Sequence, residues 1–132
     1  MMHDLGLLLL RLGFGGIMLS HGWVKIGLYS EPGFIFPDPI HLGSKLSFIL
    51  AIFAEAVCSA LVVAGLATRL ACVPVIFTML VAFTVVHSGD PWGKKEMAVL
   101  YGIGFLAILL LGPGRMSLDA FLKARKQVNA YR

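Results

Sequence analysis

The sequence contains little cysteine. Cys58 and Cys72 are the only two among 132 residues, they lie in separate apolar runs, and no C-x-x-C spacing joins them. This pattern excludes a dithiol redox motif and a cysteine-ligated iron–sulfur cluster. The glycine pattern of a dinucleotide-binding fold is also absent. The sequence therefore predicts a chain without a redox cofactor motif, in which both cysteines act as small buried hydrophobes.

Charged residues are scarce as well. Asp, Glu, Lys and Arg make up 14% of the chain and hydrophobic residues make up 58%, whereas an average soluble domain is about 25% charged. The mean hydropathy is +0.88. This composition excludes an ordinary soluble domain and indicates an integral membrane protein. We interpret the net charge of +4 as a sign of topology and of contact with anionic lipid, and we expect no binding to nucleic acid.

Four apolar runs approach or exceed the length needed to cross a membrane, which is about 20 residues. The first run lacks both a basic n-region and a cleavage site, so we interpret it as a membrane helix and not as a signal peptide. The sequence therefore predicts an all-α fold with a single domain over residues 1–132, namely a four-transmembrane-helix bundle. The predicted spans cover residues 5–26, 46–67, 69–88 and 96–112.

Basic residues are distributed unequally between the two ends of the predicted bundle. The end with both termini carries Arg69, Arg115, Lys123, Arg125, Lys126 and Arg132, and the opposite end carries Lys25, Lys45, Lys94 and Lys95. Cytoplasmic loops of membrane proteins have an excess of Lys and Arg. Six charges against four therefore predict that both termini lie in the cytoplasm.

The connection between the first two predicted spans is unusually rich in proline and aromatic residues. Residues 27–44 contain three prolines, which prevent a continuous helix, together with the apolar triplet Phe34, Ile35 and Phe36. We expect this loop to fold back as a cap over the outer end of the bundle. An aromatic anchor at the membrane interface is the alternative interpretation.

The segment after the fourth predicted span begins with helix breakers. Pro113 and Gly114 interrupt the helix, and Ser117 and Asp119 are suitable for the start of a new one. Apolar residues then share one face, while lysines lie elsewhere. The sequence predicts a short amphipathic helix over residues 117–127, at the inner membrane surface.

Six ionisable residues lie inside or at the ends of the predicted spans. They are Arg11, His21, Lys25, Glu55, His87 and Glu96. Charged groups at the centre of a span cost about 2.5–3.5 kcal/mol, so they usually face the bundle interior and pair. Glu55 falls near the midplane, where a carboxyl group is protonated, paired or beside water. Its alternative partners are Arg11 from the inner side and His21 or Lys25 from the outer side, and each pairing also has a purely structural interpretation.

Three segments carry a family resemblance, "LLRLGFGGIMLSHGWVKI", "FAEAVCSALVVAGLATRLA" and "EMAVLYGIGFLAILLLGPGRMSLD". They contain an early arginine and an HG-x-x-K ending in the first span, a glutamate before a GL-x-T-R turn, and a closing G-x-G-x-x-S-x-D. In this order they resemble the DoxX family of small bacterial membrane proteins. The positions that carry the resemblance are Arg11, His21, Gly22, Lys25, Glu55, Arg69, Glu96, Ser117 and Asp119.

The resemblance implies a four-helix protein of the bacterial inner membrane that is associated with redox chemistry. The family takes its name from a subunit linked to a thiosulfate:quinone oxidoreductase, and other members are similar to membrane partners of redox enzymes. Quinone is therefore the expected cofactor, and no haem or metal is expected. We expect Arg11 and Arg69 to take part in structural polar pairing.

The leading hypothesis is a membrane subunit of a quinone-linked redox system. Here His21, Lys25 and Glu55 line an intramembrane polar pocket between the first two helices, with His21 and Glu55 as catalytic groups. His87 and Glu96 complete the predicted quinone site. A quinone needs hydrogen-bond donors at its carbonyls and a proton path, which histidine and a buried carboxyl group supply. We expect the electron donor to be a partner subunit and the chain to form a homo-oligomer.

Other hypotheses compete with the quinone site. The main alternative is a non-enzymatic scaffold that recruits a cytoplasmic redox enzyme through the basic tail, with the polar residues serving only in packing. Haem ligation by His21 and His87 is a weaker hypothesis, because two histidines on four helices are common by chance. A small transporter would need dimerisation, since four spans without an inverted repeat do not build alternating access.

Overall fold

A computed structural model describes residues 1–130, and within this range the chain is all helical. Three helical stretches are long and apolar enough to cross a membrane, and each contains one π-helical turn. Their elements are α1 (Met2–Leu10), η1 (Arg11–Gly15) and α2 (Gly16–Tyr29), then α3 (Ser44–Ile52), η2 (Phe53–Cys58) and α4 (Ser59–Ala64), then α5 (Thr68–Val81) and η3 (Ala82–Val86). The predicted all-α class is thereby confirmed, together with three of the four predicted membrane helices.

A fourth long helix, α6 (Trp92–Leu111), packs beside α5, and a shorter helix, α7 (Leu118–Ala130), follows it. Near its start α6 carries Lys94, Lys95 and Glu96. Every stretch of 18 residues within α6 includes all three of these charged residues. Each of the three apolar helical stretches, in contrast, contains an 18-residue segment with at most two charged residues. A membrane span formed by α6 therefore stays a prediction.

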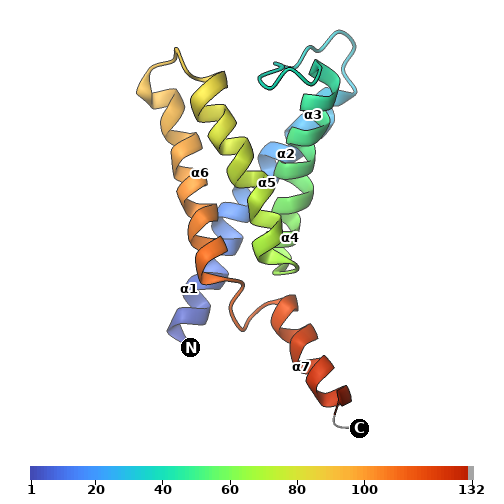
Figure 1. The fold of residues 1–132 in the computed structure, drawn as a ribbon, viewed down its shortest axis with the longest axis vertical. Helices are drawn as coiled ribbons and strands as arrows, with labels where there is room; N and C mark the ends of the chain where they lie inside the picture. Colours follow the sequence, from blue (N-terminus) through green and yellow to red (C-terminus); the bar gives the residue numbers. More distant parts are fainter. Residues whose placement is uncertain (131–132) are drawn as a thin grey trace.

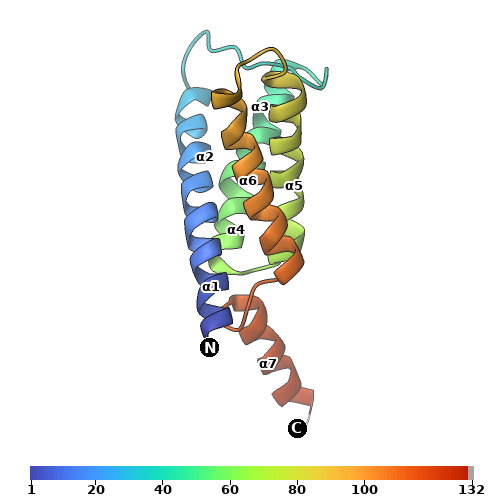
Figure 2. The same ribbon diagram turned by 90° about the vertical axis from the view of Figure 1, so that its left-hand side faces the viewer.

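The long helices lie side by side, as Figures 1 and 2 show from two directions. One end of the bundle carries loop 30–43 and the turn 87–91, and we call it the loop end. The other end carries the N-terminus, the turn 65–67 and the start of α7, and we call it the terminal end (Figure 1). The two loops therefore cover one end, while the N-terminus and α7 lie at the other.

Small residues allow the helices to pack closely. A Cβ atom on Gly22 would lie 2.5 Å from the backbone nitrogen of Ala56, so α2 and η2 touch backbone to backbone at this point. Gly104 of α6 similarly faces the Phe14 ring, which would lie 2.4 Å from an added Cβ. Such glycines are typical of interfaces between membrane helices. The fully buried apolar core includes Met18, Val62, Cys72, Val75, Phe105 and Ile108.

Loop 30–43 folds back onto α3 through an aromatic cluster. The ring of Phe36 stacks on Phe48 with centroids 4.6 Å apart, and Tyr29 and Phe34 pack around the same ring. Oδ2 of Asp38 accepts a hydrogen bond of 2.8 Å from the backbone of Gly43, at the start of α3. The hydrogen bond from the Ser47 hydroxyl is the main cause that lowers the pKa of Asp38. The loop is thus fastened to the second helical stretch.

Arg11 is buried at the terminal end, with 2% of its surface exposed. Its guanidinium donates four hydrogen bonds of 2.8–2.9 Å to backbone carbonyl oxygens. These acceptors belong to Val62, Val63, Pro113 and Met116. Arg11 therefore joins the first helical stretch to the end of α4 and to the segment before α7, and it does not pair with Glu55. Arg69 makes a weaker contact, since its Nη2 lies 3.4 Å from the carbonyl oxygen of Leu110.

Asp119 joins the base of α7 to the start of α5. Its carboxylate accepts hydrogen bonds from the backbone N–H of Ala67 at 2.8 Å and from the N–H and hydroxyl of Thr68 at 3.0 Å. Its own N–H donates to the carbonyl oxygen of Gly65 at 2.8 Å. Burial acts to raise the pKa of Asp119, but these hydrogen bonds and the nearby Arg11 charge outweigh it and lower the pKa.

The helix α7 points away from the bundle at the terminal end (Figures 1 and 2). None of its residues is buried, and it presents both apolar and basic side chains. It begins one residue later than predicted and continues three residues further. Its predicted place at the membrane surface stays a prediction. Arg132, which the topology prediction counts among the basic residues, lies outside the described residues.

Candidate functional site

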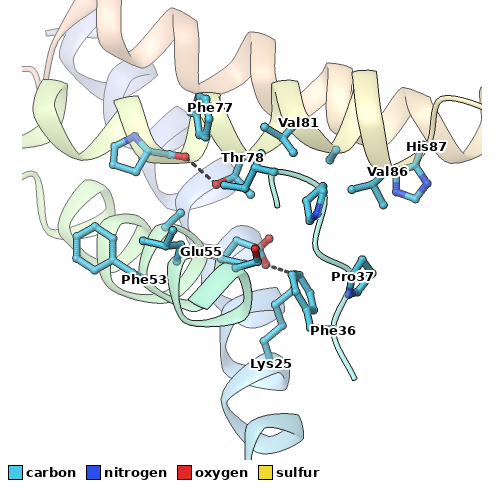
Figure 3. A pocket seen from close by; sticks show the side chains of 18 residues that line it. Lys25, Phe36, Pro37, Phe53, Glu55, Phe77, Thr78, Val81, Val86 and His87 are labelled. Carbon is cyan, nitrogen blue, oxygen red and sulfur yellow. Dashed lines mark hydrogen bonds and ion pairs between the residues drawn. The ribbon is translucent and has the colours of Figure 1, made fainter. Parts of the chain in front are cut away.

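A cavity of about 450 Å³ lies between the stretches α3–η2 and α5–η3, toward the loop end (Figure 3). Its walls are mostly apolar side chains of these stretches, and loop 30–43 contributes Phe36, Pro37 and Ile40. Lys25 reaches it from α2. Binding sites for small molecules typically measure about 300–1,000 Å³. The cavity is therefore large enough for the head group of an organic ligand.

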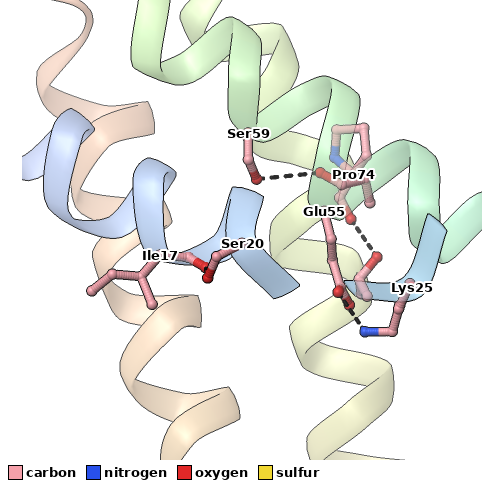
Figure 4. A network of polar contacts seen from close by, with 8 residues as sticks. Ile17, Ser20, Lys25, Glu55, Ser59 and Pro74 are labelled. Carbon is pink, nitrogen blue, oxygen red and sulfur yellow. Dashed lines mark hydrogen bonds and ion pairs between the residues drawn. The ribbon is translucent and has the colours of Figure 1, made fainter. Parts of the chain in front are cut away.

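An ion pair forms part of the cavity wall. Nζ of Lys25 donates to Oε2 of Glu55, and this contact joins α2 to η2 (Figure 4). The side chain of Glu55 is 5% exposed and that of Lys25 is 25% exposed. Gly22 lies one turn before Lys25 and lets the two helices approach closely enough for the pair to form. A buried carboxylate at this depth needs a partner of opposite charge, and Lys25 is that partner for Glu55.

A second polar pair lies where η3 ends. Nδ1 of His87 is 2.7 Å from Oδ2 of Asp90, and the His87 side chain lines the cavity. The hydrogen bond with His87 lowers the pKa of Asp90, and the positive charge of Lys94 acts in the same direction. Because Nδ1 faces Asp90, Nε2 is the ring nitrogen that can serve a ligand.

His21 and Glu96 lie away from this cavity. The His21 ring is exposed and packs edge-on against Tyr101 of α6, with ring centroids 5.9 Å apart. Glu96 is an exposed residue near the start of α6. Neither side chain lines the cavity. Of the five residues predicted to bind quinone, the structure therefore brings together Lys25, Glu55 and His87.

The position of the cavity corrects the predicted pocket between the first two helices. The backbones of α2 and η2 are in contact at Gly22, so no space for a ligand remains between them at that level. The space lies instead between the second and third helical stretches, and only Lys25 reaches it from the first. The correction has a simple cause, because a glycine that permits close packing also removes the volume that a pocket needs.

The polar groups that line the cavity include the ammonium of Lys25, the carboxylate of Glu55 and the imidazole of His87, and most of the other lining side chains are apolar. Among residues 1–130, no three His, Cys, Asp or Glu side chains gather closely enough to hold a metal ion. Cys58 and Cys72 are buried free thiols. The site therefore suits an organic ligand that carries hydrogen-bond acceptors on a mainly apolar body.

The fold defines a multi-pass helical membrane protein with a loop-covered cavity between its helices. The model of the DoxX family matches residues 6–88, which include the second and third apolar helical stretches, all but the first four residues of the first stretch, and every ionisable residue of the cavity wall. The chain belongs to the DoxX family. The match ends before α6, so the closing G-x-G-x-x-S-x-D segment lies outside it.

A relative with a curated description is an uncharacterized membrane protein, Rv3486, of Mycobacterium tuberculosis. It is 31% identical over 141 aligned positions, which cover 88% of this chain and 80% of the relative. No solved structure matches the chain significantly. The relative supports membership of a membrane protein family and carries no information on activity.

Sequence reasoning missed Asp90 and the stacking of Phe36 on Phe48, although it predicted that the loop caps the bundle. The spacing could have predicted the contact of Asp90 with His87, because a carboxylate three residues after a histidine can accept a hydrogen bond from one ring nitrogen within a turn. The stacking of Phe36 on Phe48 had no comparable signal, since it depends on the path of a loop with three prolines.

Proposed function

We propose that this protein is the membrane subunit of a quinone-linked redox system and that a quinone head group binds in the cavity. The observation that supports this most strongly is the Lys25–Glu55 pair in an apolar cavity wall. A buried ion pair is weak evidence for stability, because an apolar pair of similar volume often serves as well. Ionisable groups inside a membrane usually mark functional sites.

Lys25 and Glu55 provide the hydrogen-bond chemistry that a quinone needs. An ammonium has three N–H donors, and Lys25 uses one of them on Glu55. The remaining donors can bind a quinone carbonyl, while Glu55 can accept a proton close to it. A bound quinone supplies two-electron redox chemistry, which the chain's own side chains lack. The electron donor in this proposal is a redox-enzyme partner.

His87 provides a second polar contact at the loop end of the same cavity. Asp90 holds Nδ1, which directs Nε2 to the ligand and fixes the orientation of the ring. Histidine exchanges protons near neutral pH. His87 therefore replaces His21 as the histidine of the proposed site.

The proposed setting is the bacterial inner membrane, with α6 as a fourth span and both termini in the cytoplasm. Four spans place the two termini on one side, and the larger number of basic residues lies at the terminal end. The cavity, at the loop end, then lies toward the outer surface. A homo-oligomer and a redox-enzyme partner belong to the same proposal.

The test is mass spectrometry of organic extracts from protein purified in mild detergent. We expect quinone to be enriched over bulk phospholipid in the wild type and lost in Lys25→Met and Glu55→Gln. The matched control is His21→Ala, which changes an ionisable residue of the same helix outside the cavity and should retain quinone. Equal quinone content in all four proteins, at the level of bulk lipid, would reject the proposal.

The scaffold is a second candidate function, supported by α7. This helix has no buried residue, carries Lys123, Arg125 and Lys126, and points away from the bundle. A charge-reversed variant, Lys123→Glu/Lys126→Glu, should lose a cytoplasmic redox partner in co-purification while keeping its quinone. Loss of the partner in Lys25→Met, with α7 intact, would favour the cavity over the scaffold.

A further inference from the structure

The cavity is lined on one side by side chains that also face outward. Leu50 and Phe53 on the second helical stretch are 42% and 47% exposed, and Phe77 on the third is 55% exposed. Figure 3 shows Phe53 and Phe77 on the two stretches that border the cavity. Since both stretches are membrane helices, exposed side chains in their middle contact lipid. We call Leu50, Phe53 and Phe77 the lateral mouth.

The lateral mouth lies near the middle of the membrane. Phe53 is the tenth residue of the stretch Ser44–Ala64, and Phe77 is the tenth of Thr68–Val86. At about 1.5 Å per residue, each is about 14 Å from the start of its helix. The backbone of Lys25 lies four residues before the end of α2 at the loop end, but its ammonium contacts Glu55, the twelfth residue of Ser44–Ala64. The ion pair therefore lies at about the depth of the lateral mouth, and His87 marks the loop end of the cavity.

The opposite side of the cavity is covered by loop 30–43. Phe36 lines the cavity and is held by its stacking on Phe48 and by two hydrogen bonds with Ser44, of 3.1 Å and 2.6 Å. Asp38 fastens the following residues to the start of α3. Pro37 and Pro39 restrict the backbone between these contacts. The loop therefore forms a fixed roof between the cavity and the aqueous phase.

From this arrangement we infer that the ligand enters sideways from the bilayer and binds with an apolar tail passing through the lateral mouth. The head group then contacts Lys25, Glu55 and His87, while the tail lies among lipid chains between Phe53 and Phe77. The class of ligand is a quinone with a long isoprenoid tail, an assignment that rests on the proposed function. A water-soluble ligand without a tail fits this arrangement poorly, because its direct path is covered by the roof.

Photo-crosslinking tests this inference on the full-length protein in proteoliposomes. The probe is a quinone analogue with a diazirine on the first carbons of its tail, and adducts are located by peptide mass spectrometry. We expect adducts near Leu50, Phe53 and Phe77, reduced at least fivefold by excess unlabelled long-tailed quinone. Ile103 of α6 is the matched control, because it is 61% exposed and lies outside the cavity, and its labelling should not respond to competitor.

Two results would overturn the lateral mouth. Competed adducts confined to loop 30–43 would show that the tail leaves through the roof, while the quinone proposal itself would stand. Labelling of equal strength at Phe53, Phe77 and Ile103, insensitive to competitor, would show simple partitioning into lipid.

The variants Lys25→Met and Glu55→Gln separate the mouth from the proposed head-group contacts. Competed adducts at the mouth that weaken at least fivefold in both variants support the mouth and the head-group contacts together. Adducts that persist unchanged in both variants would keep the lateral mouth and reject the role of the ion pair.

Discussion

Replacement of Gly22 by alanine tests the close packing that determines where the cavity lies. An added Cβ would lie 2.5 Å from the nitrogen of Ala56, 2.6 Å from the carbonyl carbon of Glu55 and 2.7 Å from the Cα of Ala56. All three neighbours are backbone atoms, which cannot move aside by changing a rotamer. The alanine must therefore push α2 and η2 apart, and Lys25 must lose part of its contact with Glu55.

The expected loss of unfolding free energy follows from two opposing effects. Insertion of one methyl group into a well-packed core costs about 1–3 kcal/mol. Replacement of glycine by alanine within a helix recovers about 0.5–1 kcal/mol. Their balance is a destabilisation of about 0–2.5 kcal/mol for Gly22→Ala, to which the weakened ion pair adds.

Unfolding by sodium dodecyl sulfate in mixed micelles, followed by circular dichroism, measures this difference. Gly16→Ala is the matched control, because Gly16 belongs to the same helix and an alanine Cβ there meets nothing within 4 Å. The control should gain about 0.5–1 kcal/mol, so the two substitutions should have opposite signs. A Gly22→Ala protein as stable as Gly16→Ala would refute the close contact and the explanation of the cavity's position.

Three further predictions concern polar contacts. Lys25→Met should cost about 3 kcal/mol in the same titration because Glu55 is left buried and unpaired, whereas Lys25→Met/Glu55→Leu should regain wild-type stability without binding quinone. Arg11→Lys should lose about 3–5 kcal/mol, because a single ammonium cannot reach four carbonyls held by a planar guanidinium. The wild type should lose stability as the pH falls below about 4, and Asp119→Asn should lack the part of this loss that Asp119 causes. Thermal unfolding at a series of pH values measures the difference.

The sign of the pH effect follows from the lowered pKa of Asp119. Between the folded and unfolded pKa values the unfolded chain binds more protons, so protonation favours unfolding. The contribution of Asp119 is therefore present above an unfolded value of about 3.9 and disappears as the pH falls through the folded pKa. If the stability of Asp119→Asn and that of the wild type fell equally steeply below about pH 4, the role of Asp119 would be contradicted. An Arg11→Lys protein with wild-type stability would contradict the role of the guanidinium contacts.

The helical membrane fold could be predicted because long apolar runs with few charges have few other solutions in a bilayer. The need of Glu55 for a partner followed from its depth, and the structure supplies Lys25 as that partner. The choice between Lys25 and Arg11 required the structure, because both residues lie in the first helical stretch. Arg11 is not the partner because its guanidinium donates to four backbone carbonyls that are distant in sequence.

The place of the cavity could not be read from helical periodicity. His21 and Lys25 are four residues apart, yet His21 packs on Tyr101 of α6 and Lys25 reaches η2. A π-helical turn at Glu55 adds a local irregularity, which changes the direction of later side chains relative to a regular helix. The sequence did predict that the loop caps the bundle, but the contact that fixes the roof, Phe36 on Phe48, required the structure.

The contacts of Arg11 can form only late in synthesis. Arg11 is made early, but its acceptors at Val62 and Val63 follow more than fifty residues later, and those at Pro113 and Met116 about one hundred residues later. Until residue 116 has left the ribosome, the guanidinium lacks part of its native set of four acceptors. An unpaired arginine costs about 2.5–3.5 kcal/mol at the centre of a membrane helix, and less toward a helix end, where Arg11 lies. The full set of contacts that holds Arg11 therefore forms only after nearly the whole chain has been made.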